Sequence, residues 1–360
     1  MGASIFERGA LAALVALTFG CQPDLGARSS SVEGLRLLAI QMTPAETSPG
    51  LPVSYAALLV DPNGERPDVP IDWAFCNLQK PLSELDDVAP ECFTYGAEFL
   101  APLGQGPTAQ GKLPITGCSL FGPDVPPAMA GQPPGRPADP DLTGGYYQPV
   151  RLIVPDEVPL LGAGESRLVC GLPGATTDVL SEFKLKYKVN ENPSITGVSV
   201  ISGKEETALA PDDGTSSAFE VAAGKKITLR ASWPACSQLP ACGDGACSPG
   251  EAIAAVPNTN IVECPADCTT PKGCGGAEPY VYYDPVTRGL ALRTEVLTLS
   301  WFATKGTFDA DRSGLVDGGA EAATDNGFTA PKEAGPVIVW AVLRDDRGGV
   351  SWKRYRLEVK

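Results

Sequence analysis

The stretch that decides the fold is residues 336–359, which read PVIVWAVLRDDRGGVSWKRYRLEV. Its first part, residues 336–343, is almost wholly apolar, and in its last part, residues 354–359, apolar and charged side chains alternate. Alternation with a period of two is typical of a β-strand with one buried face. The segment between them, residues 344–349, ends in two glycines, which favour a tight turn. The sequence therefore predicts a terminal β-hairpin.

Residues that favour turns are also frequent in the rest of the chain. It contains 40 glycines and 35 prolines, about a fifth of its 360 residues, compared with roughly 12% in an average protein. Such a composition argues against a helical bundle and against a doubly wound parallel sheet with long helices. It favours many short strands joined by turns, so we expect an all-β fold.

Two features of the composition exclude classes of function. The chain has no histidine, which removes Ser-His-Asp and Cys-His nucleophiles, histidine-ligated zinc and axial-histidine haem. Its formal net charge is −15, and lysine and arginine form no run. Nucleic-acid binding is therefore not expected, because phosphate contacts need clustered cations.

The length of the chain predicts about two domains. We place the boundary at residues 190–193 (NENP), so that domain 1 covers residues 32–190 and domain 2 covers residues 191–360. Residues 101–145, of which 19 are glycine or proline, are predicted to form a long loop without regular structure. The predicted strands lie at residues 35–42, 53–60, 71–76, 149–154, 166–172, 195–201, 226–233, 296–303, 336–343 and 350–359.

One further strand is predicted at residues 183–189, which read FKLKYKV. Apolar residues and lysines alternate strictly in this segment. The alternation indicates a half-exposed strand whose lysines lie on an outer face or an edge.

Part of domain 2 resembles bacterial immunoglobulin-like domains, PKD and cadherin-like modules included. The resemblance lies in residues 299–303 (LSWFA) with Gly306, in residues 328–335 (FTAPKEAG) and in the residues before the Gly-Gly turn. In such domains a tryptophan on a central strand packs between two sheets, and a hairpin closes the sandwich. We therefore expect two β-sandwiches. Domain 1 fits through Trp73 and its strand order alone, and a compact β-barrel is the alternative there.

The first residues of the chain predict export. Arg8 precedes an apolar run at residues 10–19, which is too short to span a bilayer but fits the apolar part of a secretory signal. The run leads into Gly20 and Cys21, which resemble the end of a bacterial lipoprotein signal. The resemblance implies a signal peptide at residues 1–20, lipid on Cys21 and a tether through residue 31. The alternative is an ordinary cleaved signal in which Cys21 has no role.

The cysteine count agrees with export. The chain has 11 cysteines, and setting Cys21 aside leaves an even number, as expected for disulfides in an exported protein. Four of them precede residue 190 and six follow it, a division that two separately cross-linked domains would produce. The predicted disulfide cysteines are Cys76, Cys92, Cys118, Cys170, Cys236, Cys242, Cys247, Cys264, Cys268 and Cys274.

The six later cysteines mark a predicted insertion at residues 236–274. The segments CGDGAC (242–247) and CPADC (264–268) resemble short cysteine-rich repeats of bacterial exported proteins. Zinc is not expected, because the insertion has no Cys-x-x-Cys pair and no histidine. We expect three disulfides without metal, in a pairing that the sequence leaves open. A calcium role for Asp244, Glu251 and Asp267 is the alternative.

A second candidate for calcium is the segment 309–317, DADRSGLVD. It resembles the start of an EF-hand or dockerin loop, with Asp309, Asp311, Ser313 and Asp317 as the oxygen ligands. The twelfth position, where a bidentate carboxylate belongs, is Ala320. We therefore prefer a solvated acidic loop and assign no metal or other cofactor to the chain.

Catalysis without histidine finds little support. The adjacent carboxylates Asp86 and Asp87, Glu205 and Glu206, Asp212 and Asp213, and Asp345 and Asp346 are interpreted as solvated. Adjacent side chains on a strand point to opposite faces of the sheet, and adjacent carboxylates in turns face water. The sequence has no nucleophile elbow, phosphate-binding loop or Ser-Lys signature. We do not expect an enzyme.

The expected function is that of a non-catalytic lipoprotein of the cell envelope. By analogy with lipoproteins, Gln22 after the cysteine indicates the outer membrane, on its periplasmic or its outer side. The lipid would bind the membrane, and a protein or glycan partner would bind the loops. One alternative is a carbohydrate-binding module that uses Tyr146, Tyr147, Tyr280, Tyr282 and Tyr283. A hydrolase is the weaker alternative. Tryptophans 233, 301, 340 and 352 are predicted to belong to the core.

Overall fold

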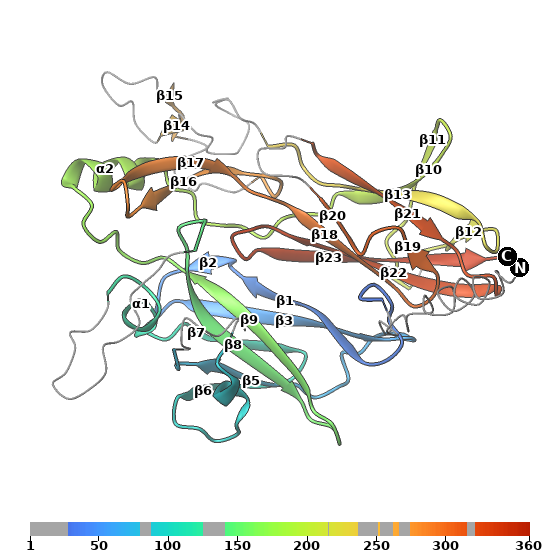
Figure 1. Cartoon of the computed structure of the whole chain (residues 1–360), viewed down its shortest axis with the longest axis horizontal. Helices are drawn as coiled ribbons and strands as arrows, with labels where there is room; N and C mark the ends of the chain where they lie inside the picture. The colour runs from blue at the N-terminus through green and yellow to red at the C-terminus, as the bar shows by residue number, and fades with distance from the viewer. Residues whose placement is uncertain are drawn as a thin grey trace, which may run out of the picture.

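The computed structural model describes residues 28–79, 88–124, 141–214, 216–236, 251–252, 262–265, 274–314 and 321–360. Nearly all regular structure in these ranges is β-strand, so the predicted all-β class is confirmed. The larger sheets form two immunoglobulin-like β-sandwiches (Figure 1). The predicted signal peptide and Cys21 lie outside the described residues.

The first sandwich packs a sheet of order β1-β3-β4, with β7 also paired to β3, on a sheet of order β2-β9-β8-β5-β6. Its core contains Tyr55 and Trp73, whose ring centroids lie 6.0 Å apart. The indole Nε1 of Trp73 donates a hydrogen bond to the carbonyl of Gly106 at 2.8 Å. The strands are β1 (Arg36–Thr43), β2 (Glu46–Thr47), β3 (Pro52–Asp61), β4 (Gly64–Glu65), β5 (Asp72–Cys76), β6 (Leu100–Gln105), β7 (Thr108–Lys112), β8 (Tyr146–Val154) and β9 (Leu160–Leu168).

The second sandwich packs a sheet of order β11-β10-β13-β21-β19 on one of order β12-β23-β22-β18-β20. The predicted terminal hairpin is confirmed, because β22 and β23 pair antiparallel along their whole length. Trp301 on β18 is fully buried between the two sheets. The strands are β10 (Gly197–Ser202), β11 (Glu205–Ala208), β12 (Phe219–Val221), β13 (Lys226–Ser232), β18 (Thr298–Ala303), β19 (Thr307–Phe308), β20 (Arg312–Gly314), β21 (Ala323–Thr329), β22 (Gly335–Arg344) and β23 (Val350–Val359).

The long apolar run in β22 is explained by a third core between the two sandwiches. Side chains alternate along the strand, so Val339 and Ala341 face the second sandwich's own core. Trp340 and Val342 face the opposite way and pack against Leu38 on β1 and other residues of the first sandwich. A strand that is buried on both faces has few polar positions. The two sandwiches therefore share buried apolar surface, and we call this region the junction.

A small additional sheet lies between β13 and β18 in sequence. The hairpin of β16 (Pro279–Asp284) and β17 (Gly289–Thr294) forms a sheet of its own, and α2 (Thr177–Lys186) packs against it (Figure 1). Within the described ranges, no helix has the length and apolar character needed to cross a bilayer. The remaining elements are η1 (Pro90–Phe93), α1 (Gly117–Leu120), β14 (Glu251–Ala252) and β15 (Val262–Glu263).

The strand predicted at residues 183–189 is wrong, because most of this segment belongs to α2. The hydroxyl of Thr176 caps the helix by accepting the N–H of Val179 at 3.4 Å. Phe183 and Tyr187, four residues apart, stack with ring centroids 4.4 Å apart, as neighbours on one helix face do. No residue of α2 is fully buried, so the alternating pattern is not enforced by a core.

The long irregular loop predicted at residues 101–145 is also wrong in its first part. Most of β6, the whole of β7 and α1 lie within it. The strands β6 and β7 lie at sheet edges, where proline and glycine are tolerated because one row of backbone groups needs no partner. Gly104 near the end of β6 and Gly106 in the turn between the two strands have φ of 103° and 138°, values that favour glycine.

Candidate functional site

The largest concentration of buried charge lies at the junction, around Arg347. This arginine sits in the turn between β22 and β23 with its side chain fully buried. Its Nη1 lies 3.0 Å from Glu295 Oε1, and its Nη2 lies 3.1 Å from Glu46 Oε2. Nη2 also donates to the carbonyl of Lys188 at 2.6 Å, and the guanidinium lies 4.4 Å from the ring centroid of Tyr280. One side chain therefore connects both sandwiches, the segment between them and the β16–β17 hairpin.

Glu46 on β2 links Arg347 to a second buried arginine. The Nε of Arg167 on β9 lies 3.4 Å from Glu46 Oε1. Glu46 also accepts the backbone N–H of Asn190 at 2.8 Å and the hydroxyl of Tyr187. Arg167 in turn donates to the hydroxyl of Tyr147 at 2.8 Å. The carboxylate of Glu46 is therefore surrounded by donors, which is the condition under which a buried charge is tolerated.

The turn that carries Arg347 is shaped by Asp345. Its Oδ1 accepts the backbone N–H groups of Arg347 at 2.9 Å and Gly349 at 2.7 Å, an arrangement typical of an Asx turn. Burial raises the pKa of the Asp345 carboxyl to about 6. Burial, and then the nearby charge of Asp345, also raise the pKa of Glu295 well above its usual range. The junction therefore contains acids that bind protons more readily than exposed ones.

Asp345 corrects an interpretation made from the sequence. Adjacent carboxylates in turns were expected to be solvated, whereas Asp345 is only 8% exposed. Glu205 and Glu206 on β11 are exposed as expected, and Asp86 and Asp87 lie outside the described residues. Sequence reasoning also missed Arg347, Arg167 and Glu46. The available signal was the aspartate that precedes Arg347 and two glycines, because this order is typical of an Asx turn.

The five tyrosines of the carbohydrate hypothesis come together at the junction, but as packed residues. Tyr280 and Tyr283 are buried, and the hydroxyl of Tyr147 donates to Asp141 at 2.8 Å. Tyr280 and Tyr282 are tilted at 47° to each other, and Tyr146 is half-buried. Tyr146, Tyr147 and Tyr282 remain partly exposed, so carbohydrate binding through these tyrosines stays a prediction.

The calcium candidates on residues 309–317 have other partners. Asp309 Oδ2 lies 2.8 Å from Lys226 Nζ, and Asp311 Oδ2 accepts the hydroxyl of Ser29 at 2.5 Å. The hydroxyl of Ser313 accepts the indole N–H of Trp301 at 2.8 Å. Asp317, like Asp244 and Asp267, lies outside the described residues, and Glu251 is in β14. In the part of the chain that the structure describes, no three cysteine or acidic side chains are grouped to hold a metal ion.

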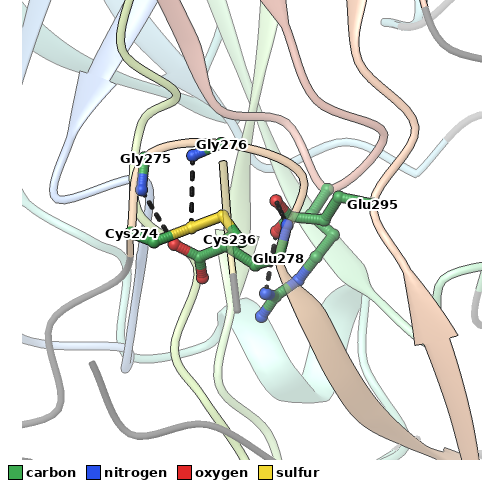
Figure 2. Close-up of a disulfide and its surroundings, with 7 residues drawn as sticks. Cys236, Cys274, Gly275, Gly276, Glu278 and Glu295 are labelled. Atoms are coloured by element: carbon green, nitrogen blue, oxygen red, sulfur yellow. Dashed lines mark hydrogen bonds and ion pairs between the residues drawn. A yellow bond between two sulfur atoms is a disulfide. The ribbon is translucent and has the colours of Figure 1, made fainter. Parts of the chain in front are cut away.

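The cysteines of the described ranges form disulfides. Cys76 pairs with Cys92 and Cys118 with Cys170 in the first sandwich, and Cys236 pairs with Cys274 beside Glu278 (Figure 2). Cys264 is also disulfide-bonded, whereas Cys242, Cys247 and Cys268 lie outside the described residues. After the Cys236–Cys274 bridge, Gly275 N donates to Glu278 Oε1 at 3.2 Å, and Glu278 N donates to Glu295 Oε2 at 3.1 Å. The disulfide is thus connected to the charged network of the junction.

Comparison with known proteins gives no family. No protein-family model matches the chain, and no curated protein matches it. Among solved structures, dimeric latent PorU from Porphyromonas gingivalis aligns with 92% of this chain at a TM-score of 0.20 and 10% identity, over 24% of its own length. Escherichia coli alpha-2-macroglobulin aligns with 93% of this chain at a TM-score of 0.20 and 11% identity, over 23% of its own length. The adhesin InvE from Yersinia pseudotuberculosis aligns with 92% of this chain at a TM-score of 0.19 and 10% identity, over 61% of its own length.

The chain therefore spans about a quarter of the first two of these proteins and less than two thirds of the third. Likenesses with TM-scores at this level carry no argument for a shared fold or function. The assignment of two immunoglobulin-like β-sandwiches rests on the sheets and cores described above.

Proposed function

We propose that the chain is a lipoprotein of the bacterial cell envelope, attached to the outer membrane through Cys21, with a binding or structural role and no catalytic activity. The observation that carries the proposal is the state of the cysteines. Each cysteine in the described ranges is disulfide-bonded. Disulfides persist in oxidising compartments outside the cytosol, which supports export of the chain.

The start of the described chain supports a short attachment. Arg28 Nη1 donates to the carbonyl of Phe308 at 2.6 Å, and Val32 N donates to Ala303 O at 2.9 Å. Residues that the sequence assigned to a tether therefore lie against the second sandwich. Cys21 precedes Arg28 by seven positions, a span of at most about 25 Å. With lipid on Cys21, the second sandwich would lie close to the membrane surface.

The junction supports a structural or binding role. Its buried ionisable side chains are engaged with one another, as Arg347 is with Glu46 and Glu295. Because a buried charge that loses its partner is strongly unfavourable, these contacts hold the two sandwiches in one relative orientation. A fixed orientation presents the loops of both sandwiches as one preformed surface, which suits a protein or glycan partner.

The proposal is tested by labelling cells with a radioactive fatty acid. The wild-type protein should carry the label and sediment with outer membranes, whereas Cys21→Ala and Cys21→Ser should carry none and be released as soluble protein. Thiol titration of the denatured, unreduced protein should find no free thiol in the mature form. A label that persists in both variants, or an unlabelled wild type, would contradict attachment through Cys21.

The binding role is tested separately, by affinity capture of the native protein from crosslinked membranes. A protein or glycan should be recovered with the wild type and be lost or strongly reduced with Cys21→Ala, which removes only the attachment. Recovery of nothing beyond what an unrelated lipoprotein captures would contradict a binding role.

A further inference from the structure

A cavity of about 470 Å³ lies at the edge of the junction. It opens between β1 of the first sandwich and strands β18, β20 and β22 of the second. Three arginines line it, Arg36 from β1, Arg312 from β20 and Arg344 from β22. The chain as a whole carries a net charge of −15, so three guanidinium groups around one cavity are a local reversal of its charge.

These arginines differ from the others at the junction in having no carboxylate partner. Arg347 and Arg167 each form ion pairs, whereas Arg36, Arg312 and Arg344 form none with the described residues. Arg344 donates to the carbonyl of Leu38 at 2.5 Å and to the hydroxyl of Ser300 at 3.3 Å. Burial, and then the nearby charge of Arg312, lower the pKa of Arg344. A half-buried cation beside a second cation is stabilised by an anion.

The acids that line the cavity are already engaged. Asp311 accepts the hydroxyl of Ser29, and the charges of Arg28 and Arg312 lower its pKa after the hydrogen bonds of Ser29 and Ser30. Asp345 accepts the backbone of the turn around Arg347. Neither acid is within ion-pair distance of Arg344. The hydroxyls of Thr298 and Ser300 line the same wall and add donors for oxygen.

We propose that this cavity binds a phosphate group, either free or as the headgroup of an envelope lipid. Guanidinium groups match the oxygens of phosphate in geometry and charge. Three guanidinium groups and the nearby hydroxyls together offer more hydrogen-bond donors than one planar carboxylate can accept. A phosphate monoester presents three oxygens and up to two negative charges, and it therefore matches these donors better. The cavity is also lined by Ser29, so a ligand bound there would lie beside the first described residues of the chain.

This inference goes beyond the proposed function, because the cavity belongs to the folded junction whether or not Cys21 carries lipid. The test therefore uses the full chain with Cys21→Ala, which binds no membrane through an anchor of its own. Binding of inorganic phosphate is measured by calorimetry. Binding to vesicles is measured by flotation, with phosphatidic acid in phosphatidylcholine compared with phosphatidylcholine alone.

Two variants remove cavity arginines, and a third serves as the control. Arg312→Gln changes an exposed side chain that makes no hydrogen bond to the described residues, and Arg344→Gln changes the half-buried one. Arg356→Gln alters the net charge equally but lies on β23, away from the cavity lining. We expect the first two to weaken binding roughly tenfold to a hundredfold, as the loss of a charged hydrogen bond does. Arg356→Gln should bind as the parent chain does.

Each outcome decides the proposal. Binding of inorganic phosphate without binding to phosphatidic acid vesicles supports a free ligand. Binding to the vesicles that free phosphate displaces supports a lipid headgroup. The proposal is overturned if the parent chain binds neither probe, or if Arg312→Gln binds as tightly as Arg356→Gln. Because Arg312 is exposed, this comparison holds even where Arg344→Gln fails to fold.

Discussion

The guanidinium of Arg347 lies 3.1 Å from the carboxylate of Glu46, although 301 positions separate the two residues in the chain. Both side chains are almost completely inaccessible to water, with exposed fractions of 0% and 1%. An ion pair in such surroundings adds little net stability compared with apolar residues, but removing one partner leaves the other charge buried and unpaired. The contact therefore makes the arrangement of the two sandwiches sensitive to single substitutions.

The first prediction follows from this contact. Arg347→Met should lower the free energy of unfolding by about 3–5 kcal/mol, because Glu295 would lose its buried cation and Glu46 would keep only Arg167. Urea unfolding under non-reducing conditions measures the loss. Arg230→Met is the matched control, since Arg230 pairs with Asp325 on the surface, where solvent screens the interaction. Equal unfolding midpoints for the two variants would contradict the importance of the buried pair.

The second prediction concerns pH. Burial raises the pKa of Asp345 from its ordinary 3.8 to about 6 in the folded protein, so the folded state binds this proton more tightly than the unfolded chain does. The stabilisation is fully present below about pH 4 and is lost as the pH rises through 6. Asp345→Asn cannot titrate. The stability of the wild type minus that of the variant should therefore fall by on the order of 2 kcal/mol between pH 4 and pH 7.

Taking the difference between the two proteins removes the contribution of groups whose pKa does not depend on Asp345. Asp61, for example, has a lowered pKa and changes stability in the opposite direction as the pH falls. The measurement is a series of urea titrations at fixed ionic strength. A difference that stays constant over this range, or that grows with pH, would show that Asp345 is not buried as a proton-binding group.

The third prediction tests the close packing of the turn. A Cβ added to Gly349 would lie 2.1 Å from Asp345 Oδ2 and 2.9 Å from Pro193 Cδ. Gly349→Ala should therefore destabilise the protein by about 1–3 kcal/mol through overpacking. Gly197→Ala on β10 is the control, because no heavy atom lies within 4 Å of its added Cβ. It should be neutral or slightly stabilising. Thermal unfolding that ranks the two variants in the reverse order would refute this account.

Most of the longer strands were predictable from sequence, because their patterns are local. Residues 336–359 contain an apolar run, a Gly-Gly turn and an alternating run, and they form β22 and β23. The tryptophans at 301 and 340 have apolar neighbours on their strands and are fully buried. The failure at residues 183–189 has the opposite cause. That segment has no buried residue within its helix, so the helix cap at Thr176 and the contacts between successive turns outweigh the alternating pattern.

The sequence by itself determined the all-β class and the positions of most of the long strands, and it predicted an even number of disulfide cysteines once Cys21 is set aside. Each of these features depends on side-chain type and on the spacing between near neighbours. Both can be read directly from the amino-acid sequence. Only the tertiary structure decided that β22 is buried on both faces, that Glu46 and Arg347 share one buried network, and that Arg36, Arg312 and Arg344 line one cavity. A periodic pattern states which face of a strand avoids water. It does not state which distant residues cover that face. The burial of charges and the position of cavities depend on those distant residues.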